Sequence, residues 1–355
     1  MILKRGLKLL LVLALSGAVA GCATPSRGRL ADLPTWSFTP AMVFPADRSL
    51  MRPEDGVALP DGRLLVADQA HGLRLVMADG SSRPFGAFKD AGYEHVPPHR
   101  AGGANGVTLD PSGRYAIVAD VMNGVIYRTD IARERTERLY RHEFGVNMAR
   151  VDSRGGLWFT QSTRNRNEEE LWRSIAKPVA DGAVYYVAPA RDSAERAAAK
   201  VADGFLFANG LALDERAGVL YLAETLGARI LKFRMDIANG QLSGMTTVLT
   251  LAGPDNIELD GEGRLWIALP FRNEIVVADP ASGTSRSVFR IATPRSEELA
   301  REAERRSQTN ASVIDLLQPS LWEPGPGLLT GVIVSPGNGP VYATTLGNAL
   351  VRLPR

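Results

Sequence analysis

Apolar residues are grouped along the chain in short runs, separated by turns rich in Gly, Asp and Pro. Residues 207–225 give the clearest example. Leu211 and Leu213 alternate with smaller residues, a polar turn follows, and a continuous apolar run occupies residues 219–223. The alternation predicts a half-buried strand, and the apolar run predicts a fully buried one. Asn209, a polar residue, stands immediately before the first of these strands.

The same strand–turn–strand pattern occurs six times, and in each copy a polar residue opens the first strand. These opening residues are Asp55 (with Glu54 beside it), Asn105, Asn147, Asn209, Asp255 and Thr330. Three of the five steps between copies are about 42 to 50 residues long, a period typical of β-propellers with four strands per blade. The sequence therefore predicts an all-β fold, a six-bladed β-propeller.

The two longer steps predict insertions. The first, at about 164–180, is a charged stretch that fits either a solvated helical excursion or a lid. The second, at 293–323, lies between blades five and six and predicts a helix over 294–306 with Ser296 as its N-cap. We expect this helix to lie across the rim or top of the propeller, solvated rather than bound to a partner. Residues 36–44 have strand character and would supply the last strand of blade six, closing the ring.

The first strand of each propeller blade lines the central channel, so the six opening residues should meet at the channel mouth. Five of the six copies place carboxylate or amide oxygens there, and none places sulfur or histidine. Such a mixed Asp, Glu and Asn set suits a hard cation, Ca²⁺ better than Mg²⁺. Two clustered carboxylates would also repel one another without a cation between them. Local Asx turns remain an alternative explanation for the same residues.

The composition is that of an ordinary folded protein. The chain has 355 residues, of which 45% are hydrophobic and 23% charged, and its 41 basic residues nearly balance its 39 acidic ones. No basic stripe or aromatic-basic interleaving is present, so we expect no nucleic-acid partner.

The N-terminus has the features of a secretory leader. Basic residues precede a short apolar core, which predicts a signal peptide over 1–21. Residues 18–20 suit ordinary cleavage, whereas the four residues ending at Cys22 resemble a bacterial lipobox. Because Cys22 is the only cysteine in the sequence, we expect it to carry a lipid anchor, followed by a tether over 22–33 and the propeller over 34–355. The alanine after Cys22 favours a periplasmic lipoprotein anchored in the outer membrane.

Several motifs resemble those of a known family. They are Glu54-Asp55-Gly56-Val57, Gly156-Leu157-Trp158-Phe159-Thr160, Ala208-Asn209-Gly210 and Pro254-Asp255-Asn256. They resemble the strictosidine synthase-like, paraoxonase and gluconolactonase (regucalcin) group of six-bladed, calcium-dependent propellers. The resemblance covers most of the chain from Glu54 to Leu353, apart from the helix near 297–306.

This resemblance implies one Ca²⁺ site at the central channel. The implied ligands are Glu54, Asn147, Asn209 and Asp255, with Asn256 as an additional, paraoxonase-like ligand. The resemblance also implies that Glu54 rather than Asp55 points inward. Asn105 stands where paraoxonases place an active-site histidine, so we do not expect a histidine base. Met148 stands where they place an aspartate of a second calcium site, so we expect one calcium only.

We expect a calcium-dependent hydrolase of small lactones or esters. Calcium would polarise the carbonyl, Asp255 would activate water, and Asn105 would hydrogen-bond the substrate or water without binding the metal. The sequence has no Gly-x-Ser-x-Gly elbow, which argues against a serine nucleophile. Two alternatives stay open: a lipid-anchored binding or scaffold propeller with structural calcium, and a phosphotriester hydrolase using the same site.

Overall fold

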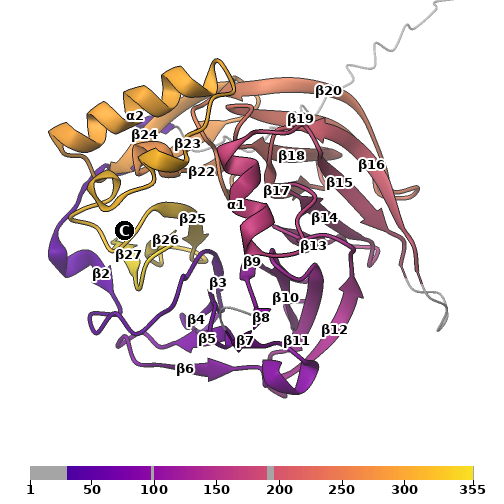
Figure 1. Ribbon diagram of the computed structural model, residues 1–355. Helices are drawn as coiled ribbons and strands as arrows, with labels where there is room; N and C mark the ends of the chain where they lie inside the picture. Colours follow the sequence, from indigo (N-terminus) through magenta and orange to yellow (C-terminus); the bar gives the residue numbers. More distant parts are fainter. Residues whose placement is uncertain (1–29, 97–99, 190–195, 355) are drawn as a thin grey trace, which may run out of the picture.

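The computed structural model describes residues 30–96, 100–189 and 196–354 (Figure 1). Six sheets lie in a ring in this part of the chain. Each is built from antiparallel strands that are consecutive in sequence, and two of them gain one further strand from the N-terminal segment. The arrangement confirms the six-bladed β-propeller and the helical insertion between blades five and six.

Each blade runs from an inner strand at the axis to an outer strand at the rim. Blade one contains β3 (Gly56–Ala58), β4 (Leu64–Asp68), β5 (Gly72–Val76) and β6 (Ser82–Phe85). Blade two contains β9 (Ala104–Leu109), β10 (Tyr115–Asp120), β11 (Val125–Asp130) and β12 (Arg135–Arg141). Blade three contains β13 (Ala149–Val151), β14 (Leu157–Gln161), β15 (Gly182–Val187) and β16 (Ala198–Phe205).

The second half of the ring follows the same plan. Blade four contains β17 (Ala208–Asp214), β18 (Val219–Glu224), β19 (Arg229–Asp236) and β20 (Gln241–Thr250). Blade five contains β21 (Ile257–Leu259), β22 (Leu265–Leu269), β23 (Glu274–Asp279) and β24 (Thr284–Arg290). Blade six contains β25 (Leu329–Val334), β26 (Val341–Thr345) and β27 (Leu350–Leu353). Short additional elements are the pair β7 (His95–Val96) and β8 (Arg100–Ala101), and the 3₁₀ turns η1 (Leu30–Asp32), η2 (Pro40–Met42), η3 (Phe88–Ala91), η4 (Pro270–Arg272), η5 (Ile314–Leu316) and η6 (Pro319–Leu321).

The N-terminal segment closes the ring, with one difference from the prediction. β2 (Val43–Phe44) pairs antiparallel with β27, placing Val43 opposite Val351, and so supplies the fourth strand of blade six. β1 (Trp36–Ser37) instead pairs in parallel with β24 and becomes a fifth strand of blade five. Trp36 is buried in a hydrophobic cluster that blades five and six share, which explains why this half of the segment joins the neighbouring blade.

Two of the predicted turns are held by the same side-chain interaction. Asp152 Oδ2 accepts a hydrogen bond from Trp158 Nε1 at 2.8 Å, and Asp260 Oδ2 accepts one from Trp266 Nε1 at 2.9 Å. Both tryptophans are fully buried, so the carboxylates satisfy indole N–H groups that would otherwise lack a partner in the core. The Asp of each turn thereby fixes the register between the inner strand and the next strand of its blade.

Both insertions contain a helix. Figure 1 shows α1 (Glu168–Ala176) near the middle of the ring and α2 (Pro294–Ser307) along one side of it. Asn167 caps α1 by accepting a hydrogen bond from the Glu170 N–H. Thr293, not Ser296 as predicted, is the N-cap of α2; Ser296 is the N3 residue of a capping box with Thr293, because Pro294 already occupies the first helical position.

Helix α2 packs against the propeller and is not solvated on every side. Leu299 and Ala303 are buried in a hydrophobic cluster together with Leu171 of α1. The same cluster includes Leu316 and Leu321 from the segment that follows α2. The two insertions, which are separated by more than a hundred residues in the sequence, therefore form one apolar layer over the axis.

The predicted signal peptide (1–21), the lipid anchor at Cys22 and most of the tether (22–33) lie outside the described residues. Among the helices that are described, none has the length and apolar character needed to cross a membrane.

Candidate metal centre and its cavity

Irregularities in the inner strands turn the opening polar residues away from the regular strand pairing. The pairing shifts register around Asn105 in β9, around Asn209 in β17 and at Thr330 in β25. Glu54, Asn147 and Asp255 each stand two residues before the inner strand of their blade. Because a bulge or a strand end re-aims its side chain, these residues are able to face the axis instead of a neighbouring strand.

Glycines after these polar residues allow the blades to approach closely. A Cβ atom on Gly106 would lie 2.7 Å from the Asn147 carbonyl oxygen, and one on Gly210 would lie 2.6 Å from the Asp255 carbonyl oxygen. Neither glycine has a positive φ, and both lie within strands. The Asn-Gly pairs of blades two and four are therefore close-packing sites and not turns, which removes the Asx-turn explanation for them.

Five of the sequence-predicted site residues line one cavity of about 100 Å³ near the axis. They are Glu54, Asn105, Asn147, Asn209 and Asp255. Asn256 lies beside this set, because its Nδ2 donates a hydrogen bond to Glu54 Oε1 at 3.1 Å. All six side chains belong to residues that are only 2–8% exposed. The structure thus brings together residues from blades one to five that the sequence separates by up to 202 positions.

Four buried oxygen atoms of this set have no hydrogen-bond partner: Glu54 Oε2, Asn147 Oδ1, Asn209 Oδ1 and Asn256 Oδ1. For Asn209 and Asn256, the amide nitrogen donates to Thr225 Oγ1 and to Glu54 Oε1, respectively, which fixes the amide orientation and leaves the oxygen free. Buried polar atoms are nearly always paired in proteins, so a cluster of unpaired oxygens needs an explanation.

The chemistry of these atoms fits a hard cation. Ca²⁺ binds carboxylate and amide oxygens at flexible geometry, and the cluster offers both kinds. The described residues contain no group of three or more His, Cys, Asp or Glu side chains that could hold a metal ion. A cation at this position would therefore depend on the asparagine oxygens as much as on the two carboxylates.

The two carboxylates of the cavity are electrostatically unfavourable neighbours. Burial raises the pKa of Glu54 well above its ordinary value, and the charge of Asp255 raises it further, while Arg52 opposes the effect. Burial likewise raises the pKa of Asp255 to about 8, although a hydrogen bond from Asn209 lowers it in part. Without a cation, these groups therefore hold protons that solvated carboxylates would release.

Two other polar candidates, Asp55 and Asn105, form hydrogen bonds to neighbouring blades. Asp55 Oδ2 accepts a hydrogen bond from the Val107 N–H of blade two at 2.9 Å, so Glu54, not Asp55, faces the cavity, as the family resemblance implies. Asn105 donates from Nδ2 to the Asn147 carbonyl oxygen at 3.3 Å, and its side chain beside Glu54 helps to lower the pKa of that carboxyl group. Asn105 thus lines the cavity beside the Glu54 carboxylate.

The sequence left open whether the first insertion forms a lid, and it did not identify the residues that form the roof of the cavity. Leu171, Trp172 and Ile175 of α1 line it, together with Leu317 from the second insertion and Phe207 from the entry to blade four. The first insertion therefore covers the cavity with the apolar face of α1, as a lid would, while its charged residues Glu169 and Arg173 stay exposed. The spacing of residues 171, 172 and 175 on one helix face could have indicated this, because that face is apolar within an otherwise charged stretch.

Two polar residues of the cavity were also missed. Arg52 lies two positions before Glu54 and lines the cavity next to it. Thr225, just after β18, accepts a hydrogen bond from Asn209 and donates one at 2.8 Å to the Pro254 carbonyl oxygen. Neither residue stands at the opening position of a repeat, so the recurrence that identified the others gave no signal for them.

The fold and the cavity define a class of protein: a six-bladed β-propeller with a buried, oxygen-lined cavity at its axis and a helical lid. The family model described as SMP-30/gluconolactonase/LRE-like region matches residues 140–298, which include Asn147, Asn209 and Asp255. The match supports the resemblance of this part of the chain to the gluconolactonase group.

Individual proteins are similar to this chain in sequence or in fold. The chain is 27% identical over 186 residues to the adipocyte plasma membrane-associated protein Hemomucin of Drosophila melanogaster, and the match covers 48% of this chain but only 30% of that protein's length. A gluconolactonase from Xanthomonas campestris has the same fold, with a TM-score of 0.58, 18% identity and coverage of 86% and 87% of the two chains. Regucalcin from Agrobacterium tumefaciens, a calcium-binding protein, gives a TM-score of 0.58 at 14% identity, covering 90% and 94%.

Proposed function

We propose that this protein is a calcium-dependent hydrolase of lactones or esters. The family match supports a lactonase-type hydrolase at the level of the family. The observation that carries the proposal for this chain is the set of four buried, partnerless oxygens, which come from blades one, three, four and five. In a channel with only a structural role, these buried oxygens would be expected to accept hydrogen bonds.

Glu54, Asn147, Asn209 and Asp255 would hold the calcium, with Asn256 as a further ligand. The bound ion would supply electrophilic polarisation of the substrate carbonyl and stabilise the negative charge that develops on its oxygen. Asn105, which lines the cavity beside Glu54, would hydrogen-bond the substrate or the attacking water without binding the ion.

Asp255 is the residue best placed to take a proton from the attacking water. It is buried and lines the cavity, so its carboxylate lies where the calcium and the attacking water would meet. The apolar wall formed by Leu171, Trp172 and Ile175 would bind the hydrocarbon part of the substrate and keep bulk water away from the reacting carbonyl.

The test is turnover by the Asp255→Asn variant, which keeps an oxygen for the metal but removes the base. With calcium present, we expect hydrolysis of lactones to fall at least about 100-fold, the range in which general bases contribute. Asp61→Asn, an exposed acidic residue of blade one, is the matched control. Undiminished turnover by an Asp255→Asn variant that still binds calcium would overturn the assigned role.

A panel of lactones, aryl esters and phosphotriesters, measured with and without a chelator, separates the remaining alternatives. Calcium binding with no turnover on any of them would favour a binding or scaffold propeller. Preference for phosphotriesters would favour the second alternative. We also propose that Cys22 carries a lipid that anchors the protein to the outer membrane; Cys22→Ala should move the protein from the membrane fraction to the soluble periplasmic fraction.

A further inference from the structure

The cavity contains one positive charge. Among the residues that line it, the charged ones are Arg52, Glu54 and Asp255. Arg52 stands at the entry to blade one, and its side chain is 23% exposed. Its side chain ends in a planar guanidinium cation with five N–H donors and no acceptor. The positive charge of Arg52 lies beside the proposed calcium site and would repel the ion, so its presence there calls for an explanation.

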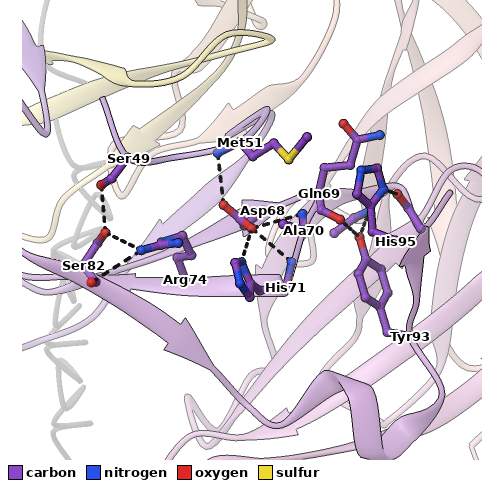
Figure 2. A network of polar contacts seen from close by, with 12 residues as sticks. Ser49, Met51, Asp68, Gln69, Ala70, His71, Arg74, Ser82, Tyr93 and His95 are labelled. Carbon is purple, nitrogen blue, oxygen red and sulfur yellow. Dashed lines mark hydrogen bonds and ion pairs between the residues drawn. The ribbon is translucent and has the colours of Figure 1, made fainter. Parts of the chain in front are cut away.

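The backbone around Arg52 is firmly anchored. Figure 2 shows Asp68 accepting a hydrogen bond from the Met51 N–H, at 3.0 Å, and the Gln69 N–H bonds the Met51 carbonyl oxygen at 2.8 Å. The Arg52 N–H in turn bonds the Gly347 carbonyl oxygen at 2.9 Å. Arg52 has a φ of 50°, a left-handed conformation that is uncommon for a residue with a side chain. Such conformations persist where the surrounding structure enforces them, and they cluster at functional sites.

Arg52 has little to compensate its charge. Among the described residues, its guanidinium group makes no hydrogen bond, and its one ion pair is with Glu168 Oε1 of the lid helix at the long distance of 3.9 Å. Glu168 is 43% exposed and also accepts a hydrogen bond from Trp172 Nε1 at 3.2 Å. Once a divalent cation balances Glu54 and Asp255, Arg52 is left as a cation in a mainly apolar cavity.

We propose that Arg52 binds a carboxylate group of the substrate, so that the preferred substrates are lactones or esters carrying a carboxylate apart from the bond that is hydrolysed. The inference rests on the proposed calcium-dependent hydrolase function and defines its substrate class. A guanidinium group pairs with a carboxylate through two parallel hydrogen bonds, which fixes orientation as well as charge. Arg52 is thus a specificity-determining residue that turns the scissile carbonyl towards Glu54 and Asp255.

Binding of a ligand that cannot be hydrolysed tests this directly. The probes are 5-oxoproline, a lactam with a ring carboxylate, and its neutral primary amide, each titrated by calorimetry into the calcium-loaded full chain. The variants are Arg52→Gln, Arg52→Lys and, as a control, Arg48→Gln. Arg48 has the same kind of backbone conformation, with a φ of 53°, but it is exposed and lies outside the cavity lining.

We expect the wild type to prefer the carboxylate over the amide, and Arg52→Gln to weaken carboxylate binding about 10- to 100-fold while leaving the amide unchanged. Arg52→Lys should restore only part of the preference, and Arg48→Gln should match the wild type. The absence of a preference in the wild type, or an equal loss for both probes in Arg52→Gln, would overturn the inference. A wild type that shows the Arg52-dependent preference but hydrolyses no lactone or ester would contradict the proposed function and leave carboxylate binding in place.

Discussion

Asn256 of blade five donates a hydrogen bond to Glu54 of blade one across 3.1 Å, although the two residues are 202 positions apart in the sequence. This bond uses one oxygen of the carboxylate and the nitrogen of the amide. It leaves Glu54 Oε2 and Asn256 Oδ1, both buried, without any partner. The candidate calcium site is therefore assembled by bonds between blades, and no single blade contains enough of it to bind an ion alone.

The carboxylate of Glu54 should dominate calcium affinity. Glu54→Gln preserves the size of the side chain and the Oε1 position that accepts from Asn256, but it removes one of the two negative charges. We expect calcium affinity, measured by titration calorimetry, to fall at least about tenfold, because affinity follows ligand charge. Asp61→Asn, whose side chain is 52% exposed, should bind calcium like the wild type. Equal affinities for Glu54→Gln and the wild type would exclude Glu54 as a ligand.

Calcium should stabilise the protein more as the pH rises. The pKa of Asp255 is about 8 and that of Glu54 is also raised, so without calcium the folded state retains protons that the unfolded chain releases above about pH 4. Folded-state stability without calcium is then fully present below the unfolded-state pKa and declines as the pH rises through the folded-state pKa. Calcium replaces these protons, so its effect on Tm should be larger at about pH 8.5 than at about pH 5.5.

The Asp255→Asn variant is the control for this pH dependence. It removes one titrating carboxylate, so the free energy of unfolding without calcium should fall less steeply between these pH values. Chemical denaturation in a chelating buffer measures this free energy. A calcium-induced increase in Tm that is the same at both pH values would contradict the competition between protons and calcium at Glu54 and Asp255.

The recurring features of the sequence sufficed to predict the ring and four of the residues that converge on its axis. Asn105, Asn147, Asn209 and Asp255 recur at the start of the inner strands of blades two to five, and the propeller geometry requires equivalent positions to meet. Glu54 came from the family resemblance, because recurrence alone could not distinguish it from Asp55. Their convergence in one cavity follows the prediction, whereas their roles in binding calcium remain a prediction.

Other parts of the site could not be predicted, because they depend on contacts between segments without a repeating position. The lid residues Leu171 and Leu317 come from two insertions that the sequence placed only coarsely, the first as either a lid or a solvated excursion and the second at the rim or top. Arg52 faces the cavity because the Met51 and Arg52 N–H groups bond Asp68 and Gly347 from distant segments. The N-cap of α2 was misplaced because Thr293 and Ser296 are both good capping residues and only their hydrogen bonds distinguish them.

Close contact between blades at the axis should make Gly210 intolerant of a side chain. Its added Cβ would lie 2.6 Å from the Asp255 carbonyl oxygen, a backbone atom that cannot move without displacing the Asp255 side chain. We expect Gly210→Ala to lower the free energy of unfolding by about 1–3 kcal/mol and to weaken calcium binding. Gly261→Ala is the matched control, because a Cβ there meets no atom within 4 Å and should change stability by less than about 0.5 kcal/mol. If the two variants had the same free energy of unfolding, the blades would be able to move apart at the axis without loss of stability, which would contradict this prediction.

The hydroxyl group of Thr225 should set the orientation of the Asn209 ligand. It accepts a hydrogen bond from Asn209 Nδ2 at 3.0 Å and donates one to the Pro254 carbonyl oxygen at 2.8 Å, so it links blade four to the segment that carries Asp255. Thr225→Val keeps the shape but leaves both of these buried groups unpaired, which should cost about 1–3 kcal/mol of stability. Because the Asn209 amide is then free to rotate, calcium affinity should fall about 10- to 100-fold, as it does when outer-shell partners of metal ligands are removed. Thr225→Ser retains the hydroxyl and should keep most of the affinity. A Val variant that is less stable but binds calcium as tightly as the wild type would show that Thr225 supports the fold without orienting Asn209.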